Sequence, residues 1–511
     1  MLKKLFLSVF AVFILAILSI CFILFTQTGN NLIASYIENK VNEEQNAVTL
    51  SVKKLTLSAD SLDFNAVIDD GSSMKINGGF NLFKQSVDLH YQLKIKELSY
   101  LAPLIGQKLQ GPLNTRGTAK GSLAKLHIQG QTDVAQSQTQ YVLTLIDRKP
   151  TIAQIKMQNA QIAQLLHLVD QPKYVMGQLN IKGQVDLSNL DQLKGNALLT
   201  IKNGQANSPL INKTFQQNLP TPTLFNLASN IKLSGQTVAA STDIKSNIAN
   251  ISAQKTTFNI QQNQLDTDYN LDVPDLRIIG KMFKQKVRGA IKIAGNAQFK
   301  HHQLSLNGHS NTLGGKLNFN LQGNQLVANL ESLSLLKILH TFYYPKIFTS
   351  TANANIRYNL LTEKGDIVAD LANGRFINSQ LANVIQQLAN FDITREIYQN
   401  IKLNSEINKK LILSNLNMQS KETQITMQQG QLNLANETLN MPLNVKVKKL
   451  LFKIGLSGDM RAPHITFDAN AMARQKAEKE IQRGLNKLMK KHPKEGKILQ
   501  DTLNLFNKKL F

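Results

Sequence analysis

The sequence predicts a mainly β protein: an elongated antiparallel sheet of repeated strands with an N-terminal transmembrane helix and C-terminal amphipathic helices. Apolar and polar residues alternate strictly in many short segments, which is the period of a strand with one apolar face. Clusters of Asn, Gly, Asp and Ser separate these segments, and helix-length patterns rarely lie between them. Antiparallel strands joined by turns are therefore expected instead of βαβ crossovers.

Composition argues against a disordered chain, a disulfide-rich protein and a cysteine-based zinc protein. The 511 residues include 58 Lys and Arg against 34 Asp and Glu, a net charge of +24, and 42% are apolar. This apolar content argues against global disorder. Cys21 is the only cysteine, which excludes a disulfide framework and a zinc site built from cysteines.

The first element is an apolar run over residues 5–25, preceded by Lys3 and Lys4 and followed by no Lys or Arg until Lys40. Its 21 residues would span roughly 30 Å as a helix, the thickness of the hydrocarbon core. A cleaved signal peptide is the alternative, but the run is long and no small-x-small cleavage site follows it. We expect residues 1–28 to form a cytoplasmic stub and a single uncleaved anchor, with these membrane residues: Leu5, Phe13, Leu18 and Phe25.

A short helix is expected next, because apolar residues recur at helical spacing after the anchor. They are Leu32, Ile33, Tyr36, Ile37 and Val41, with Lys40 beside them. The helix could lie on the outer surface of the membrane, or it could connect the anchor to the first strands. The sequence leaves both interpretations open.

Residues 29–469 are expected to form the β-repeat domain. Two segments show the alternation most clearly, around residues 87–95 and 317–321, where polar residues separate the apolar ones. Side chains at alternate positions share one face of a strand, so each set should line the same apolar face. The predicted lining residues are Val87, Leu89, Tyr91, Leu93, Ile95, Leu317, Phe319 and Leu321.

An internal repeat runs through this domain. A Gly-bounded strand pattern begins at Gly111, Gly177 and Gly289, and each copy follows an apolar cluster at helical spacing. The clusters lie at residues 98–105, 162–169 and 276–283, and a fourth at 335–342 precedes the alternating segment 356–360. The expected unit is a set of strands, one or two helical turns, and a strand bounded by glycine. Asn77, Gly78 and Gly79 are expected to form a turn.

The tail, residues 470–511, has a different composition. It carries 11 Lys and Arg and 4 Asp and Glu, with two apolar stripes at helical spacing on either side of Pro493. Two basic amphipathic helices are expected. They could cap the end of the sheet or contact a membrane surface, in which case the contacting residues would be Ile498, Leu499, Leu503 and Phe506.

This arrangement resembles the AsmA-like family, which includes the TamB-type envelope proteins. The shared features are an anchor followed by a short helix, and helical turns that lead into Gly-x-[Leu/Ile] strands. Residues 371–376 followed by the apolar segment 381–388 are similar to a strand-and-helix element of that family, and residues 429–434 and 456–463 are similar to its final strands. The resemblance covers nearly the whole chain.

The resemblance implies a U-shaped sheet with a continuous apolar groove, and a role in phospholipid movement between inner and outer membranes and in outer-membrane assembly. From the residues alone, the apolar face could equally be covered by a second sheet. We expect an inner-membrane protein whose body lies in the periplasm and passively shields acyl chains. The alternative is a scaffold or chaperone-like factor that binds strands of outer-membrane proteins. Other envelope proteins are possible partners in either case.

Enzymatic chemistry is not expected, and neither a cofactor nor a metal is predicted. The chain has no nucleophile-elbow, Walker-type or dinucleotide motif. His301 and His302 are adjacent, so on a strand they would point to opposite faces and could not easily share a metal. A nucleic-acid partner is not expected either, because the positive charges are spread along the chain and anionic lipid headgroups would explain them.

Overall fold

The computed structural model describes residues 26–44, 49–68, 71–102 and 108–467, with the single tail residues 480, 483, 486, 487 and 490. The predicted anchor residues Leu5, Phe13, Leu18 and Phe25 lie outside these ranges, and so do the tail residues Ile498, Leu499, Leu503 and Phe506. Within the described ranges, no helix combines the length and the apolar character needed to cross a bilayer.

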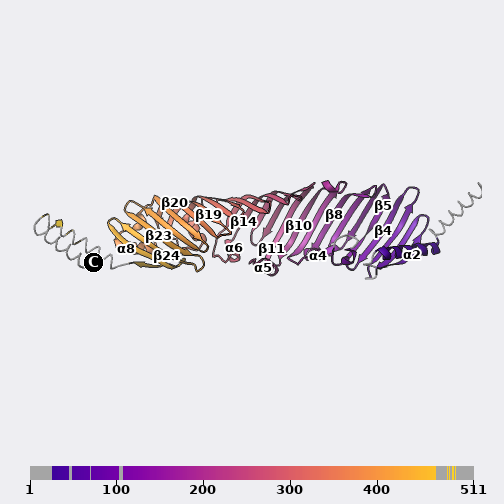
Figure 1. Cartoon of the computed structure of the whole chain (residues 1–511), viewed down its shortest axis with the longest axis horizontal. Coiled ribbons are helices and arrows are strands. Elements are labelled where there is room, and N and C mark those ends of the chain that lie inside the picture. The colour runs from indigo at the N-terminus through magenta and orange to yellow at the C-terminus, as the bar shows by residue number, and fades with distance from the viewer. Residues whose placement is uncertain are drawn as a thin grey trace, which may run out of the picture. The chain divides into compact units, whose positions relative to one another are not determined.

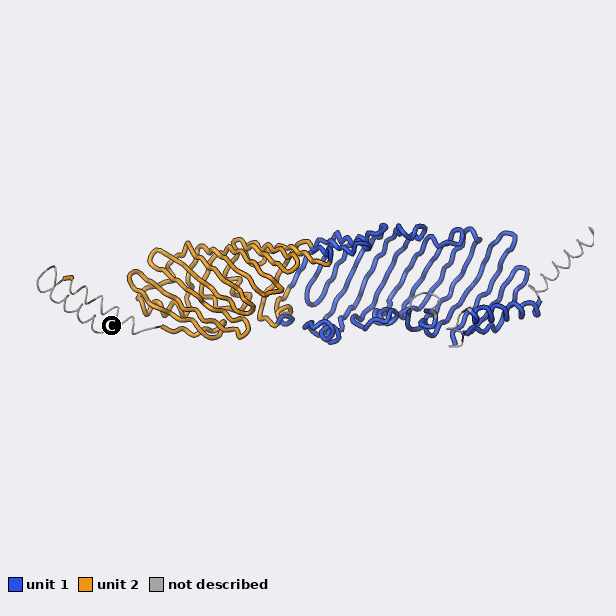
Figure 2. Tube along the Cα trace, in the orientation of Figure 1, with its two compact units in different colours: residues 1–273, 281–283, 297–301 blue, residues 274–280, 284–296, 302–511 orange. Residues whose placement is uncertain are grey.

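The described part of the chain is mainly β, and its 26 strands belong to one antiparallel sheet, which confirms this part of the predicted fold class. From β1 to β14, and again from β16 to β26, each strand pairs with the next one along the chain, so neighbouring strands lie side by side (Figure 1). The 26 strands divide between two compact units, which Figure 2 shows in different colours.

Unit 1 runs to Val273 and also includes residues 281–283 and 297–301. Its helices are α2 (Gln27–Glu44), α4 (Ile162–Leu168) and α5 (Ser208–Phe215), with 3-10 turns η1 (Leu98–Leu101), η2 (Val134–Gln136) and η3 (Leu190–Gln192). Its strands are β1 (Leu50–Leu57), β2 (Ser61–Ile68), β3 (Ser73–Asn81), β4 (Ser86–Ile95), β5 (Leu113–Ser122), β6 (Lys125–Thr132), β7 (Gln138–Ile146), β8 (Lys149–Gln161), β9 (Val175–Asp186), β10 (Lys194–Ala206), β11 (Thr223–Ser234), β12 (Thr237–Ser246), β13 (Asn250–Asn259) and β14 (Gln264–Val273).

Unit 2 comprises residues 274–280, 284–296 and the chain from His302 onward. Its helical elements are α6 (Leu276–Met282, which ends in unit 1), α7 (Leu335–Thr341), α8 (Gln380–Ala389) and η4 (Ile393–Arg395). Its strands are β15 (Ile291–Lys300, which also ends in unit 1), β16 (Gln303–Ser310), β17 (Lys316–Gln322), β18 (Gln325–Ser334), β19 (Phe348–Asn359), β20 (Lys364–Phe376), β21 (Asn400–Asn408), β22 (Leu411–Gln419), β23 (Thr423–Asn433), β24 (Thr438–Val447), β25 (Leu450–Asp459) and β26 (His464–Phe467).

The short helices lie where the repeat predicts helical turns. The 3-10 turn η1 and helices α4, α6 and α7 fall on the four apolar clusters, and α4 and α7 begin directly after the last residues of β8 and β18. The expected turn at Asn77–Gly79 was wrong, because these residues lie inside β3, where Gly78 pairs with Leu89. A Cβ at Gly78 would lie 2.2 Å from the carbonyl oxygen of Asp88, so this glycine permits close strand approach instead of a turn.

Four of the bulges in the sheet share one polar contact. At each, the register shifts, one residue adopts a positive φ, and its amide donates to the side-chain oxygen of an Asn on the neighbouring strand. The side chain therefore satisfies an N–H group that the ladder leaves unpaired. The four pairs are Asn159 with Asn180 (2.9 Å), Asn203 with Asn226 (3.1 Å), Ser332 with Asn353 (2.8 Å) and Gln429 with Asn415 (3.0 Å).

Helix α2 covers the free edge of β1. The side chain of Asn42 accepts from the amide of Leu50 (2.7 Å) and donates to its carbonyl (3.0 Å). Asn30, which is buried, makes the same two contacts with Leu57 at 3.2 and 3.4 Å. The structure thus places the helix against the first strand, with the outward-facing Leu32 and Tyr36 exposed. An edge strand with unpaired backbone groups can pair with other chains, and α2 occupies that position.

Replacing both asparagines should free this edge. Each hydrogen bond contributes about 1 kcal/mol, so the variant Asn30→Ala with Asn42→Ala should increase amide exchange at Leu50 and Leu57 about tenfold in hydrogen-exchange mass spectrometry. The control is Asn31→Ala with Asn39→Ala, which removes two exposed asparagines from the outer side of the same helix. Equal exchange in the two variants would contradict the role assigned to Asn30 and Asn42.

Candidate apolar binding face

The register of unit 1 aligns its apolar residues across all fourteen strands. Residues directly opposite each other in an antiparallel pair project from the same face. Followed from strand to strand through Leu89, this pairing gives one row in which every member is apolar or glycine. The row is Leu57, Leu62, Gly78, Leu89, Ala119, Ile128, Leu143, Ala153, Val185, Gly195, Leu233, Val238, Phe258 and Leu265.

A second row lies two residues along each strand and passes through Tyr91. It contains no charged residue, and its only member that is neither aromatic, aliphatic nor glycine is Thr256. The row is Leu55, Phe64, Ile76, Tyr91, Gly117, Gly130, Tyr141, Ile155, Gly183, Ala197, Ile231, Ala240 and Thr256. Together the two rows form an apolar face on unit 1.

Five of the eight predicted lining residues lie on this face of unit 1, and the other three lie on an apolar face of unit 2. Of the five on β4, Val87, Leu89, Tyr91 and Leu93 are half-buried and Ile95 is buried, while the polar residues between them are exposed. In unit 2, Leu317, Phe319 and Leu321 are half-buried on one face of β17, with exposed polar residues between them. Leu321 belongs to a row of ten, all apolar or glycine: Leu306, Leu321, Leu326, Tyr358, Gly365, Ile407, Ile412, Leu432, Leu439 and Gly458. Contact with lipid remains a prediction for all eight.

Much of the face in unit 1 is open to solvent. Ile155 on β8 is 37% exposed. Ile251 on β13, which projects from the same face of the sheet, is 38% exposed, although both are large apolar side chains. Most other members of the two rows are half-buried, and no second layer formed by described residues encloses them. An extended apolar surface of this kind is unusual on a protein without a partner for it.

Two tyrosines interrupt the apolar character of the second row. Tyr91 and Tyr141 project from β4 and β7, and their hydroxyls meet over the two strands between them at 2.7 Å. Gly117 and Gly130 make room, because a Cβ at either position would lie 2.5–2.6 Å from a tyrosine hydroxyl. Burial and the neighbouring Tyr141 raise the pKa of Tyr91, so this hydroxyl stays protonated at neutral pH.

In unit 2 the part of the corresponding face near α8 is covered by protein, whereas the face residues of β17 stay half-buried. Helix α8 packs Leu381 and Ile385 against strand residues such as Val445 and Ile454, and all four are less than 5% exposed. Tyr398 is fully buried in the same core, and burial raises its pKa to about 12 while its hydroxyl is hydrogen-bonded to Thr423. The sequence predicts one apolar face along the chain, and the structure leaves much of it open in unit 1 and covers the part of it near α8 in unit 2.

An ion-pair cluster joins loops of unit 2 that are far apart in the sequence. The guanidinium of Arg461 binds both carboxylate oxygens of Glu437, and the amine of Lys286 lies 3.6 Å from the same group. Beside them, the hydroxyl of Tyr344 lies 3.8 Å from the sulfur of Met460. Arg461 is only 21% exposed at its side chain, and it holds the pKa of Glu437 below its usual range.

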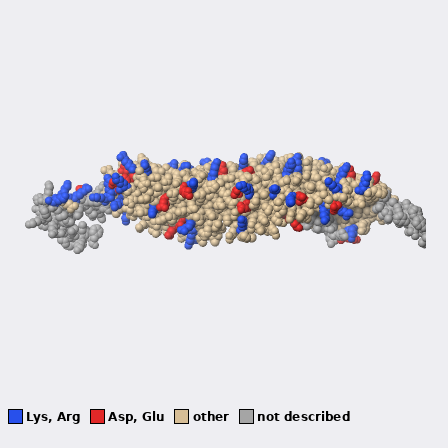
Figure 3. All heavy atoms as spheres, turned by 90° about the horizontal axis from the view of Figure 1, so that it is seen from above, with Lys and Arg blue, Asp and Glu red and all other residues tan. Residues whose placement is uncertain are grey.

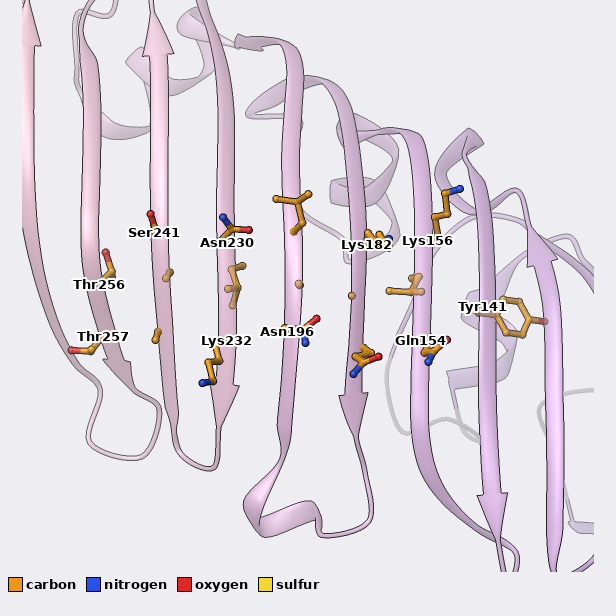
Figure 4. A pocket seen from close by; sticks show the side chains of 18 of the residues that line it. Tyr141, Gln154, Lys156, Lys182, Asn196, Asn230, Lys232, Ser241, Thr256 and Thr257 are labelled. Atoms are coloured by element: carbon orange, nitrogen blue, oxygen red, sulfur yellow. The ribbon is translucent and has the colours of Figure 1, made fainter.

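The opposite face of unit 1 is polar and carries hollows. A hollow of about 980 Å³ runs across β7–β13, and a second of about 670 Å³ runs across β3–β7. Figure 4 shows the first between two lines of side chains, one through Asn230 and Lys182, the other through Lys232 and Asn196. These residues alternate with the second apolar row, so they point away from it. Charged residues on the view in Figure 3 are scattered among wide uncharged areas.

In the part of the chain that the structure describes, no group of three or more His, Cys, Asp or Glu side chains could hold a metal ion. His301 and His302 lie in the turn between β15 and β16, both with positive φ, and not on a strand as expected. Both are exposed. Positive φ at two adjacent residues allows the chain to reverse between two paired strands.

Comparison of the chain with protein-family models, with curated proteins and with solved structures finds no match. The resemblance to the AsmA-like family therefore stays a prediction from the sequence.

The ion-pair cluster should make the stability of unit 2 depend on pH. Because the folded-state pKa of Glu437 is lowered, its ionised form stabilises the fold above the unfolded pKa, about 4.3, and this contribution disappears as pH falls through the folded value. Glu437→Gln should lower the melting temperature at pH 7 and leave Arg461 partly buried without its partner. The difference from the unmodified protein should narrow below about pH 4. Glu406→Gln, at an exposed position of β21, is the control. Equal losses at both pH values would contradict this account.

Proposed function

We propose that the apolar face of unit 1 binds lipid acyl chains and shields them from water as they pass along the sheet. In this proposal residues 5–25 anchor the protein in the inner membrane, its body lies in the periplasm, and it supports phospholipid supply to the outer membrane. The observation that carries the proposal is the first row, fourteen strands long, in which every residue is apolar or glycine.

The dimensions of the row suit acyl chains. Strands lie about 4.8 Å apart, so fourteen strands give an apolar track of about 60 Å. A bilayer core of roughly 30 Å holds two acyl chains end to end, so the track is as long as about four of them. The track carries no charge along its length, and an acyl chain has no polar group that would lose a hydrogen bond there.

One feature favours lipid over a second protein layer, and another argues against strand binding at the sheet edge. A covering sheet or helix leaves its contact residues almost fully buried, as α8 does in unit 2, whereas Ile155 and Ile251 are more than one-third exposed. The alternative role, binding partner strands at a sheet edge, is not favoured at β1, because α2 occupies that edge. The resemblance to the AsmA-like family adds weight to the lipid interpretation.

A charge on the apolar face should block lipid binding. The full chain with Leu89→Asp and Leu93→Asp should lose more than tenfold of the phospholipid that co-purifies with the unmodified protein in native mass spectrometry, because an unpaired charge is costly in an apolar site. The control, His90→Asp with Gln92→Asp, places the same charges on the exposed face of the same strand and should keep the lipid. Circular dichroism and thermal melts report whether both variants fold.

A photoreactive phenylalanine analogue tests the proposal without added charge. At position 155, on the open apolar face, it should cross-link to phospholipid, and at the adjacent position 154, on the opposite face, it should not. Absence of cross-linking at 155, or equal cross-linking at both positions, would count against lipid binding even if the aspartate variant unfolds.

A further inference from the structure

The polar face of unit 1 carries two continuous rows of side chains that have no role in the proposed function. One row starts at Lys75 and the other at Asn77, and directly paired residues extend each through ten strands, from β3 to β12. Both rows project from the face opposite the apolar rows, because their members alternate with the residues of the Tyr91 row.

The space between the rows forms one channel. The hollow over β3–β7 contains Lys75 and Asn77 in its lining but not Ile76, whose side chain points to the other face. The hollow over β7–β13 is lined by members of the Tyr91 row and by the residues next to them on each strand. Its lining contains none of the apolar-face residues that lie two positions from a member of that row on the same strand. The two hollows share Gln140, Tyr141 and Val142, so they join into a single track on the polar face.

The composition of the rows is strongly one-sided. Among the twenty positions, five are basic, nine are Asn or Gln, and none is Asp or Glu. The basic residues are Lys75, Arg116, Lys156, Lys182 and Lys232. A row with cations, many amides and no carboxylate presents positive charge and both hydrogen-bond donors and acceptors.

One pair in the channel is unfavourable without a ligand. Lys156 and Lys182 lie directly opposite each other on β8 and β9, and both are exposed. Like charges in this position destabilise a sheet. Other lysines of the same face have carboxylate partners, such as Lys120 with Asp88 at 2.6 Å. Among the described residues, no carboxylate lies within ion-pair distance of Lys156 or Lys182. An anion between the two rows would remove the repulsion.

We propose that this channel binds a linear acidic polysaccharide. Its Cβ rows lie about 7 Å apart, two residues along each strand, and extend about 43 Å over ten strands, which accommodates one extended polymer and not a flat surface or a duplex. The amides would bind sugar hydroxyls, and the lysines would bind carboxylate or phosphate groups. Neither row contains Phe, Tyr or Trp, the side chains on which nucleic-acid bases stack. Strand spacing also gives a regular repeat close to the length of one sugar ring.

Binding can be measured with the full purified chain and oligosaccharides of polygalacturonic acid, in parallel with uncharged dextran oligosaccharides of the same length. We expect binding of the acidic glycan alone, weakened by added salt because exposed charges are screened within about 10 Å at 0.1 M. Lys156→Glu with Lys182→Glu should reduce affinity at least tenfold, and Lys156→Gln with Lys182→Gln by less.

The control is Lys125→Glu with Lys245→Glu, which makes the same charge change on the same face outside the two rows and should change affinity less than twofold. Equal loss in both glutamate variants would overturn the proposal, because it would indicate a general charge effect. So would equal binding of dextran, or tighter channel-dependent binding of a single-stranded oligonucleotide or of phosphatidylglycerol vesicles. If the glutamate variant fails to fold, the glutamine variant, which removes the repulsion between the two lysines, decides the outcome.

Discussion

The structure depends on one constraint, that the sheet has a single apolar face. Antiparallel pairing of successive strands places every alternate residue on the same side, so the apolar surface accumulates strand by strand. Fully burying one Leu or Ile side chain contributes about 1.5–3 kcal/mol, which makes an uncovered row of such residues costly. Unit 2 meets this constraint near α8 with a closed core. Unit 1 leaves Ile155 and Ile251 open, and that difference locates the candidate site.

Period-2 alternation has a second consequence, because it specifies the polar face as strictly as the apolar one. The same register that aligns Leu89 with Ala119 and Leu143 also aligns Lys156 with Lys182. A change in register by one residue would exchange the two faces of a strand. The bulges are therefore significant, because each absorbs a register shift, and an Asn side chain such as that of Asn180 satisfies the displaced amide.

The sequence allowed the β-class, several strands and most helices to be predicted, because these follow from local periodicity. The alternation at residues 87–95 became β4, and the apolar clusters became α4, α6 and α7. Features that depend on pairing could not be predicted. Gly78 looks like part of a turn until its partner strand is known. The polar channel was missed for the same reason, since its lysines are separated in sequence and meet only through register. The covering of the apolar face in one part of unit 2 also depends on tertiary packing by α8.

The order of the strands along the sheet matters for how the protein is made. Within each unit every strand pairs with the strand before it, so no strand waits for a partner from a distant part of the chain. Contacts of this local kind favour rapid folding and let structure propagate from one end. A growing chain could add hairpins to the sheet in the order of synthesis, beginning at β1, whose outer edge α2 already occupies. The same locality means that a hairpin gained or lost in evolution would lengthen or shorten the sheet without rearranging the rest.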